Sequence, residues 1–150
     1  MLSRNAPIAN LKTDIDMAAR GIENNNPGNI RLSKEKFVGE IQPSRDPEFK
    51  QFRSMAYGYR ALMRVLKTYY HKHGLRTIRG IVNRWAPTSE NPTGNYISAV
   101  VRDTGKGADE PLEWDKPTIT SMAAAISNVE NGTKANMADV EDGWTLLEGK

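Results

Sequence analysis

The sequence predicts a mainly helical α+β domain with a small β-hairpin or irregular region near residues 20–53. Its 150 residues are 38% hydrophobic and 26% charged, which are values typical of a globular domain that can bury one core. Apolar residues recur at helical spacing after residue 54, whereas turn-forming residues and short apolar runs dominate residues 20–53. We therefore expect a single domain over residues 1–150, with residues 1–19 forming either a short helix or an N-terminal arm.

Residues 20–31 read RGIENNNPGNIR, in which three consecutive asparagines precede Pro27-Gly28. Asparagine tolerates left-handed backbone and bonds its own main chain, so this stretch predicts a tight irregular loop. Short apolar runs at Phe37-Val38 and at residues 49–52 are the candidate strands of the hairpin.

Five helices are expected downstream, each with a start signal or an apolar stripe and most with a glycine or proline stop. Their approximate ranges are 54–74, 77–86, 91–105, 117–131 and 137–147.

Composition excludes several kinds of chemistry. The chain has no cysteine and two histidines, which rules out disulfides, a thiolate nucleophile and a three-histidine metal site. We expect no metal and no cofactor. Residues 1–16 lack the apolar core of a secretory signal, and no apolar run reaches the ~20 residues of a membrane-spanning helix.

The net charge of +3 averages two different regions. Residues 51–89 carry eight basic side chains and no acid, whereas residues 101–150 carry ten acids and five bases. The basic region could adhere to an anionic envelope, or the two regions could simply compensate within one fold. Nucleic-acid binding is a minority hypothesis, which a gel shift that weakens steeply with salt would support.

Glu130 is the residue that departs most clearly from its pattern. It lies eleven residues after Ile119, in phase with the apolar stripe of its helix. A buried carboxylate is costly unless it is protonated, paired or faces a cleft, and burial and the negative end of the helix dipole both favour the protonated form. Such a group could serve as a general acid for glycosidic bonds. The alternative is a helix-end carboxylate that leans into solvent.

Other residues compete for a role in the site. Glu23 lies in the Asn-rich loop and Glu90 lies at a helix entrance, where a carboxylate also suits the helix dipole. The amides of the loop could bind the acetamido groups of amino sugars.

Three segments resemble a family of phage and prophage virion or structural proteins that are lysozyme-like. They are RGIENNNPGNIR, residues 57–100 and AAAISNVENG at 123–132. The last also resembles the Glu-bearing helix of lytic transglycosylases and glucosaminidases, with Glu130 at the acid position. In those enzymes this helix comes first, so the resemblance implies a circularly permuted lysozyme-like domain. In the phage family's loop motif a basic residue is expected where this chain has Glu23.

The resemblance implies a phage-encoded peptidoglycan hydrolase that cleaves between N-acetylmuramic acid and N-acetylglucosamine, as a muramidase or lytic transglycosylase. Glu130 would be the general acid, Glu90 the candidate second carboxylate, and Asn25, Asn26, Asn29 and Tyr96 the substrate-binding residues. Such a protein would reside in the virion or the host cytoplasm and act in the cell wall. The alternative is a non-catalytic virion component that binds glycan or other virion proteins.

Overall fold

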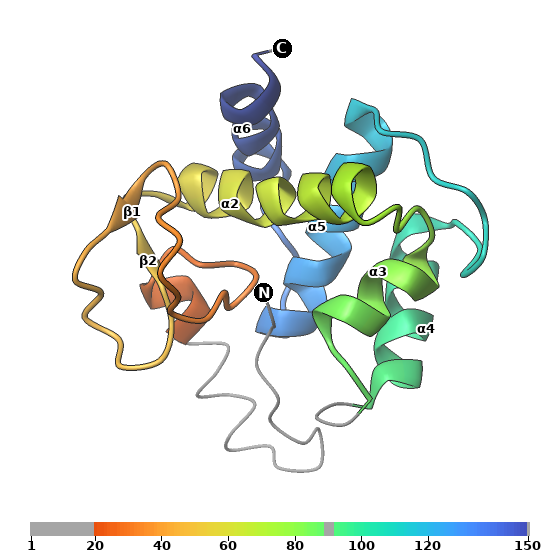
Figure 1. Ribbon diagram of the computed structural model, residues 1–150, viewed down its shortest axis with the longest axis horizontal. Helices are drawn as coiled ribbons and strands as arrows, with labels where there is room; N and C mark the ends of the chain where they lie inside the picture. The colour runs from red at the N-terminus through yellow and green to blue at the C-terminus, as the bar shows by residue number, and fades with distance from the viewer. Residues whose placement is uncertain (1–19, 89–91, 150) are drawn as a thin grey trace.

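The computed structural model describes residues 20–88 and 92–149, and these form a mainly helical fold with one small antiparallel sheet (Figure 1). A short helical segment at residues 20–23 leads into the Asn-rich loop. The elements that follow are β1 (Glu40–Ile41), β2 (Gln51–Phe52), α2 (Met55–Lys67), η1 (Thr68–Lys72), α3 (Ile78–Trp85), α4 (Thr93–Thr104), α5 (Lys116–Asn131) and α6 (Met137–Glu148). The mainly α fold class is thus confirmed.

Helix starts follow local capping chemistry. Ser54 and Thr77 cap α2 and α3 as expected, since each side-chain oxygen accepts a bond from a backbone N–H in the first turn. Asp115 caps α5 in the same way, one to two residues before the expected start. Helix α4 begins at Thr93, within the expected range of 91–105, and Pro92 occupies its cap position.

The expected helix over residues 54–74 changes geometry near its end. It is α-helical as far as Lys67 and continues as the π-helix η1, in which the His73 N–H donates to the Thr68 carbonyl at 3.3 Å. Apolar periodicity cannot predict this change because both geometries bury the same tyrosines. The chain leaves the helix at Gly74, whose φ is +66°.

The second strand, Gln51–Phe52, falls within the predicted residues 49–52, but the first strand lies later in the chain than predicted. The first strand is Glu40–Ile41, paired as Glu40 with Phe52 and Ile41 with Gln51, and residues 37–38 belong to the preceding loop. The prediction of a strand at Phe37-Val38 was therefore wrong. Phe37 does pack against Phe52, with ring centroids 6.4 Å apart, but it does so from the loop.

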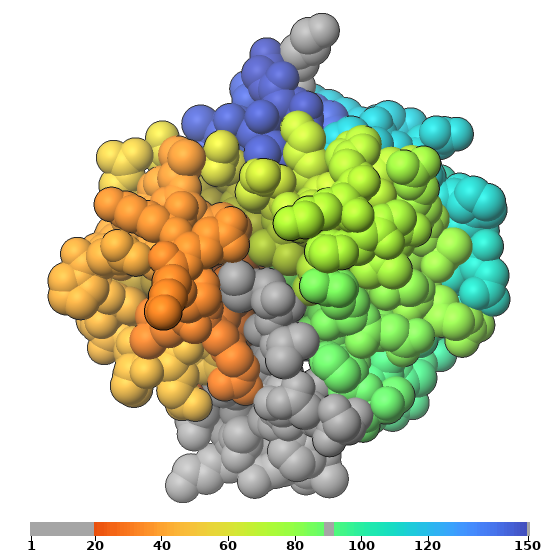
Figure 2. All heavy atoms as spheres, viewed as in Figure 1, coloured from red at the N-terminus to blue at the C-terminus, as the bar shows by residue number. Residues whose placement is uncertain are grey.

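Helix α2 runs across the middle of the molecule, with the hairpin near its first residues and α3 and α4 near its other end (Figure 1). Helix α6 packs closely against α2 at Gly143, where an added Cβ would lie 2.7 Å from the Tyr59 Cβ. Buried side chains from all these elements, from Ile30 to Trp144, make one hydrophobic cluster. In the space-filling view, residues 20–53 and the α3–α4 region form opposite sides of the visible face (Figure 2).

Within the described ranges, no helix has the length and apolar character needed to cross a bilayer.

Candidate functional site

Glu130 is buried near the C-terminal end of α5. Its exposed fraction is 4%, and Gly132, with φ +66°, turns the chain away two residues later. The side chain therefore points into the protein, and the alternative of a solvent-facing helix-end carboxylate is wrong.

Side chains from three separate segments donate hydrogen bonds to the Glu130 carboxylate. The Tyr96 hydroxyl of α4 lies 2.9 Å from Oε2, and the Trp85 Nε1 of α3 lies 3.4 Å from the same oxygen. The Asn29 Nδ2 lies 3.3 Å from Oε1. Donors of this kind offset the cost of burying a carboxylate. They also hold it in one orientation, which suits a group that must meet a reacting atom.

The Asn-rich loop delivers Asn29 to this position through an unusual backbone. Asn25 and Asn29 have φ values of +52° and +49°, a conformation that asparagine adopts more readily than other non-glycine residues. Gly28 leaves room for the indole of Trp85, since a Cβ there would lie 3.0 Å from the Trp85 Cζ2. The loop therefore supplies Asn29 as one donor to Glu130, and its Gly28 leaves space for the indole ring of Trp85, which is a second donor.

Asn25 and Asn26 connect the loop to the neighbouring hairpin. The Asn25 Nδ2 donates to the Phe52 carbonyl at 3.1 Å. The buried Asn26 Nδ2 donates to the carbonyls of Ile30 and Lys50 at 3.0 and 2.9 Å, while its Oδ1 accepts from the Ile30 N–H. A sugar contact by these two amides stays a prediction, and at the buried Asn26 it would have to replace bonds within the protein.

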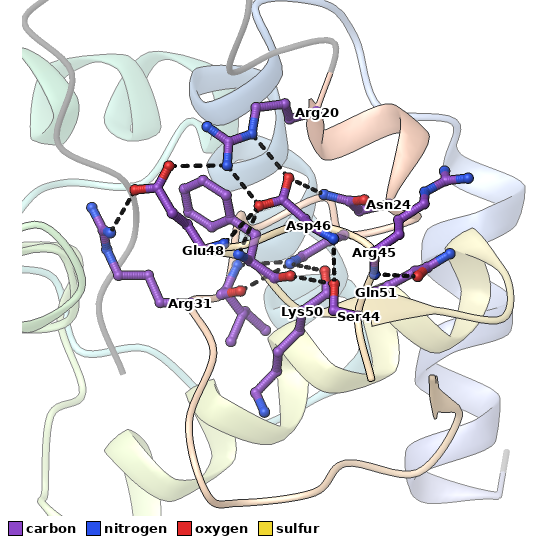
Figure 3. Close-up of polar contacts among 12 residues, drawn as sticks. Arg20, Asn24, Arg31, Ser44, Arg45, Asp46, Glu48, Lys50 and Gln51 are labelled. Atoms are coloured by element: carbon purple, nitrogen blue, oxygen red, sulfur yellow. Dashed lines mark hydrogen bonds and ion pairs between the residues drawn. The ribbon is translucent and has the colours of Figure 1, made fainter. Parts of the chain in front are cut away.

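An ion-pair network anchors the start of the loop (Figure 3). Asp46 accepts bonds from the Arg20 guanidinium at 2.6 and 2.9 Å and from the Asn24 Nδ2 at 3.0 Å. The Arg20 guanidinium beside it holds the pKa of the Asp46 carboxyl well below its usual range. The hydrogen bond to Asp46 also raises the pKa of Arg20, and a further hydrogen bond to Glu48 raises it in the same direction.

A second polar chain joins the loop to α5 and α2. The Asn131 Nδ2 donates to the Pro27 carbonyl at 2.9 Å and to the Ser127 carbonyl at 3.0 Å. Ser127 Oγ and the Tyr59 hydroxyl lie 2.8 Å apart. These contacts hold the loop against the same turn of α5 that carries Glu130.

The structure brings together three of the predicted site residues, namely Glu130, Tyr96 and Asn29. Asn25 and Asn26 face the hairpin, and Glu90 lies outside the described residues. Trp85, Ser127 and Asn131 were not predicted as site residues. Trp85 lies on the buried apolar face of α3, and its indole N–H is the signal that could have marked it as a donor.

Metal binding finds no support in the described ranges, where no cluster of three or more metal-ligating side chains occurs.

Comparison with known proteins relates this chain to a protein of a bacteriophage. No known family model matches the sequence. The chain is 40% identical over 129 residues to Protein P5 of Pseudoalteromonas phage PM2, an alignment that covers 84% of this chain and 79% of the relative. The name of the relative states no activity. At this identity and coverage, the chain belongs to the same family as Protein P5 of the bacteriophage PM2.

Proposed function

We propose that this protein cleaves the glycan strand of peptidoglycan between N-acetylmuramic acid and N-acetylglucosamine, with Glu130 as the general acid. The observation that carries the proposal is the burial of the Glu130 carboxyl, since burial of a carboxyl group favours its protonated form. The donors from α3, α4 and the Asn-rich loop hold this carboxyl in one orientation and stabilise the carboxylate that is left once the proton has moved. The phage relative supports a setting in which a bacterial wall must be breached. The resemblance of residues 123–132 to the Glu-bearing helix of lytic transglycosylases supports the same role for Glu130.

In the proposed step, the Glu130 proton moves to the glycosidic oxygen as the bond from that oxygen to the sugar C1 breaks. The leaving sugar departs as an alcohol, and Glu130 is left as a carboxylate that the donors of Tyr96 and Asn29 stabilise. The contact to Trp85, at 3.4 Å, is the longest of the three. It is therefore the one that an approaching sugar oxygen would displace at least cost.

Two fates of C1 distinguish the candidate reactions. A hydrolase adds water to C1 and needs a second group to activate that water or to form an intermediate, a role for which Glu90 is the candidate. In a lytic transglycosylase the C6 hydroxyl oxygen of the muramic acid bonds to C1, its proton passes to the Glu130 carboxylate, and the sugar is left with a 1,6-anhydro ring. Mass spectrometry of the products separates them, because the anhydro product is lighter by one water.

Glu130→Gln is the direct test of the proposal. The amide keeps the shape of the side chain but supplies no acid proton, so wall clearing in turbidity and zymogram assays should fall by about 10²-fold or more. Glu148→Gln is a matched control, since Glu148 also lies in the last turn of a helix that a left-handed glycine follows, but bonds to Lys67 and Trp114 instead. If Glu130→Gln clears walls as well as the wild type does, Glu130 is not the acid.

The second candidate is a non-catalytic virion component that binds glycan or other virion proteins. The observation that favours it is the family relationship to a protein of a bacteriophage. It predicts no clearing of any wall chemotype by the wild type, together with cosedimentation with purified peptidoglycan or with phage particles.

A further inference from the structure

A small basic cavity lies on the side of α3 and η1 where Tyr69 packs against Trp85, one of the donors to Glu130. Its volume is about 110 Å³, and it lies between the loop that precedes β1, the α2–η1 helix and the last turn of α3. The polar side chains that line it are Glu35, Arg64, Thr68, Tyr69, His73 and Arg84. The size suits a small charged group rather than a whole sugar.

Two guanidinium groups line this cavity without a carboxylate partner among the described residues. Arg64 donates to the Thr68 hydroxyl at 3.0 Å, and the Arg84 guanidinium lies 5.2 Å from the centroid of the Tyr69 ring. The acid in the lining, Glu35, lies on the exposed loop before β1 and forms no ion pair with either arginine in the described structure. The cavity therefore carries more positive than negative charge.

The pKa of the His73 imidazole depends on the positive charge of this cavity. Desolvation, followed by the charges of Arg84 and Lys72, lowers the pKa of its imidazole. An anion placed among the same groups would offset those cations and raise that pKa.

The π-helix η1 shapes the same cavity. Its wider turn stacks His73 over Thr68 through the bond from the His73 N–H to the Thr68 carbonyl, and both residues line the cavity. Single π-turns are rare in proteins and often occur at functional sites. Here the turn brings a titratable side chain to the two arginines.

We propose that Arg64, His73 and Arg84 form an oxyanion-binding pocket for a carboxylate of the peptide attached to the glycan substrate. Planar guanidinium groups suit carboxylate and phosphate oxygens. The ring of Tyr69 packs edge-on against Trp85 at 6.4 Å, and Trp85 donates to Glu130, so two aromatic rings connect the pocket to the proposed acid. The choice of the peptide carboxylate rests on the proposed function, whereas the pocket itself does not.

Binding of inorganic phosphate tests the pocket without requiring that the protein cleave peptidoglycan. The chain has two histidines, so NMR titration of their ring signals with and without phosphate follows His73 and uses His71 as the internal control. We expect phosphate to raise the pKa of His73 and to leave that of His71 unchanged. Arg84→Gln and Arg64→Gln should each weaken this response several-fold, and Glu35→Gln should strengthen it. Equal shifts of both histidines, or a response that survives both arginine changes, would overturn the pocket.

Cleavage of peptide-bearing and peptide-free glycan strands tests the source of the oxyanion. The wild type should cleave peptide-bearing strands several-fold faster, and the ratio should fall toward one in the Arg64→Gln/Arg84→Gln variant. Arg79→Gln, which changes an exposed arginine of α3 outside the cavity, should keep the wild-type ratio. A wild type that cleaves both strands equally refutes the peptide carboxylate but not the proposed function. If neither strand is cleaved, the proposed function fails, and the phosphate titration still decides whether the pocket binds oxyanions.

Discussion

At the residue scale, three consecutive asparagines have three different partners. Asn24 donates to the Asp46 carboxylate, Asn25 to the backbone of β2, and Asn26 to the carbonyls of Ile30 and Lys50. An amide can donate and accept at once, and the short side chain reaches backbone groups that a glutamine would overshoot. The three asparagines are thus not interchangeable, because each makes a different contact that helps to position Asn29.

Asp46→Asn should destabilise the protein in a pH-dependent way. Arg20 holds the pKa of Asp46 below the ~3.9 of an unfolded chain. Its stabilisation is therefore complete above about pH 4 and is lost as the pH falls through the lowered folded-state pKa. We expect a loss of about 1–3 kcal/mol in the free energy of unfolding near neutral pH, and a smaller difference from the wild type below about pH 4, in urea unfolding.

Asp109→Asn is the comparison for this prediction. Arg79 also lowers the pKa of Asp109, but both side chains are more than half exposed, so solvent screens the pair and little stability should be lost. An Asp46→Asn effect that is independent of pH would contradict the assigned role of the ion pair.

At the scale of elements, the hairpin is organised around a buried ion pair. The Lys50 Nζ lies 3.0 and 3.1 Å from the two Glu40 oxygens and 2.7 Å from the Glu35 carbonyl, and both side chains are almost wholly buried. Glu40 also accepts from the Phe37 N–H at 3.0 Å. Burial of this glutamate explains why the strand begins at Glu40 and why the apolar Phe37-Val38 run lies outside it.

Lys50→Met should cost about 3–5 kcal/mol in the free energy of unfolding, because it leaves the Glu40 carboxylate buried without its cation. The double variant Glu40→Gln/Lys50→Met should recover part of that loss, since it removes both charges. Urea unfolding of the wild type, both single variants and the double variant gives the coupling energy.

Lys116→Met provides a surface reference, because Lys116 and Glu141 are 3.6 Å apart and both about half exposed. Its cost should stay below about 0.5 kcal/mol. Additive effects of the two hairpin substitutions would show that the buried pair is not coupled.

At the scale of the whole molecule, the site depends on contact between segments about a hundred residues apart. Gly21 lies against α5, where an added Cβ would overlap the Asn131 Oδ1 and lie 3.0 Å from the Asn29 Oδ1. Both amide oxygens are buried and accept no hydrogen bond within the described part of the chain. The missing Cβ is therefore what allows the first helical segment to close over the residues that hold Glu130.

Gly21→Ala should lower the free energy of unfolding by about 1–3 kcal/mol, because the new methyl group must displace buried amides. Wall clearing should fall further than the folded fraction explains, since Asn29 would move away from Glu130. Thermal unfolding and the turbidity assay measure the two effects separately.

Gly94→Ala is the matched control, because Gly94 lies in the first turn of α4 with open space around its Cα. It should be neutral or should stabilise by up to about 1 kcal/mol. If the two alanine variants behave alike, close packing at Gly21 does not shape the site.

Much of the helical framework could be predicted because its signals are local. Ser54 and Thr77 cap the helices that follow them, and Gly105 and Gly132 end α4 and α5, because caps and stops act within a few residues. The change to π-helix at Thr68 and the displaced first strand could not be predicted. The π-helical segment keeps the apolar pattern of an α-helix. The position of β1 depends on the ion pair of Glu40 with Lys50, which lies ten residues further along the chain.

The sequence by itself determined that Glu130 lies in phase with an apolar helix face, because the helical period places residues eleven apart on one side. It also determined that the Asn-rich stretch is irregular, since asparagine and glycine admit left-handed backbone. Only the tertiary structure decided that Glu130 is buried and that Asn29, Trp85 and Tyr96 meet it. Those contacts join segments 34 to 101 residues apart, and no local pattern encodes which distant donors will satisfy a buried carboxylate.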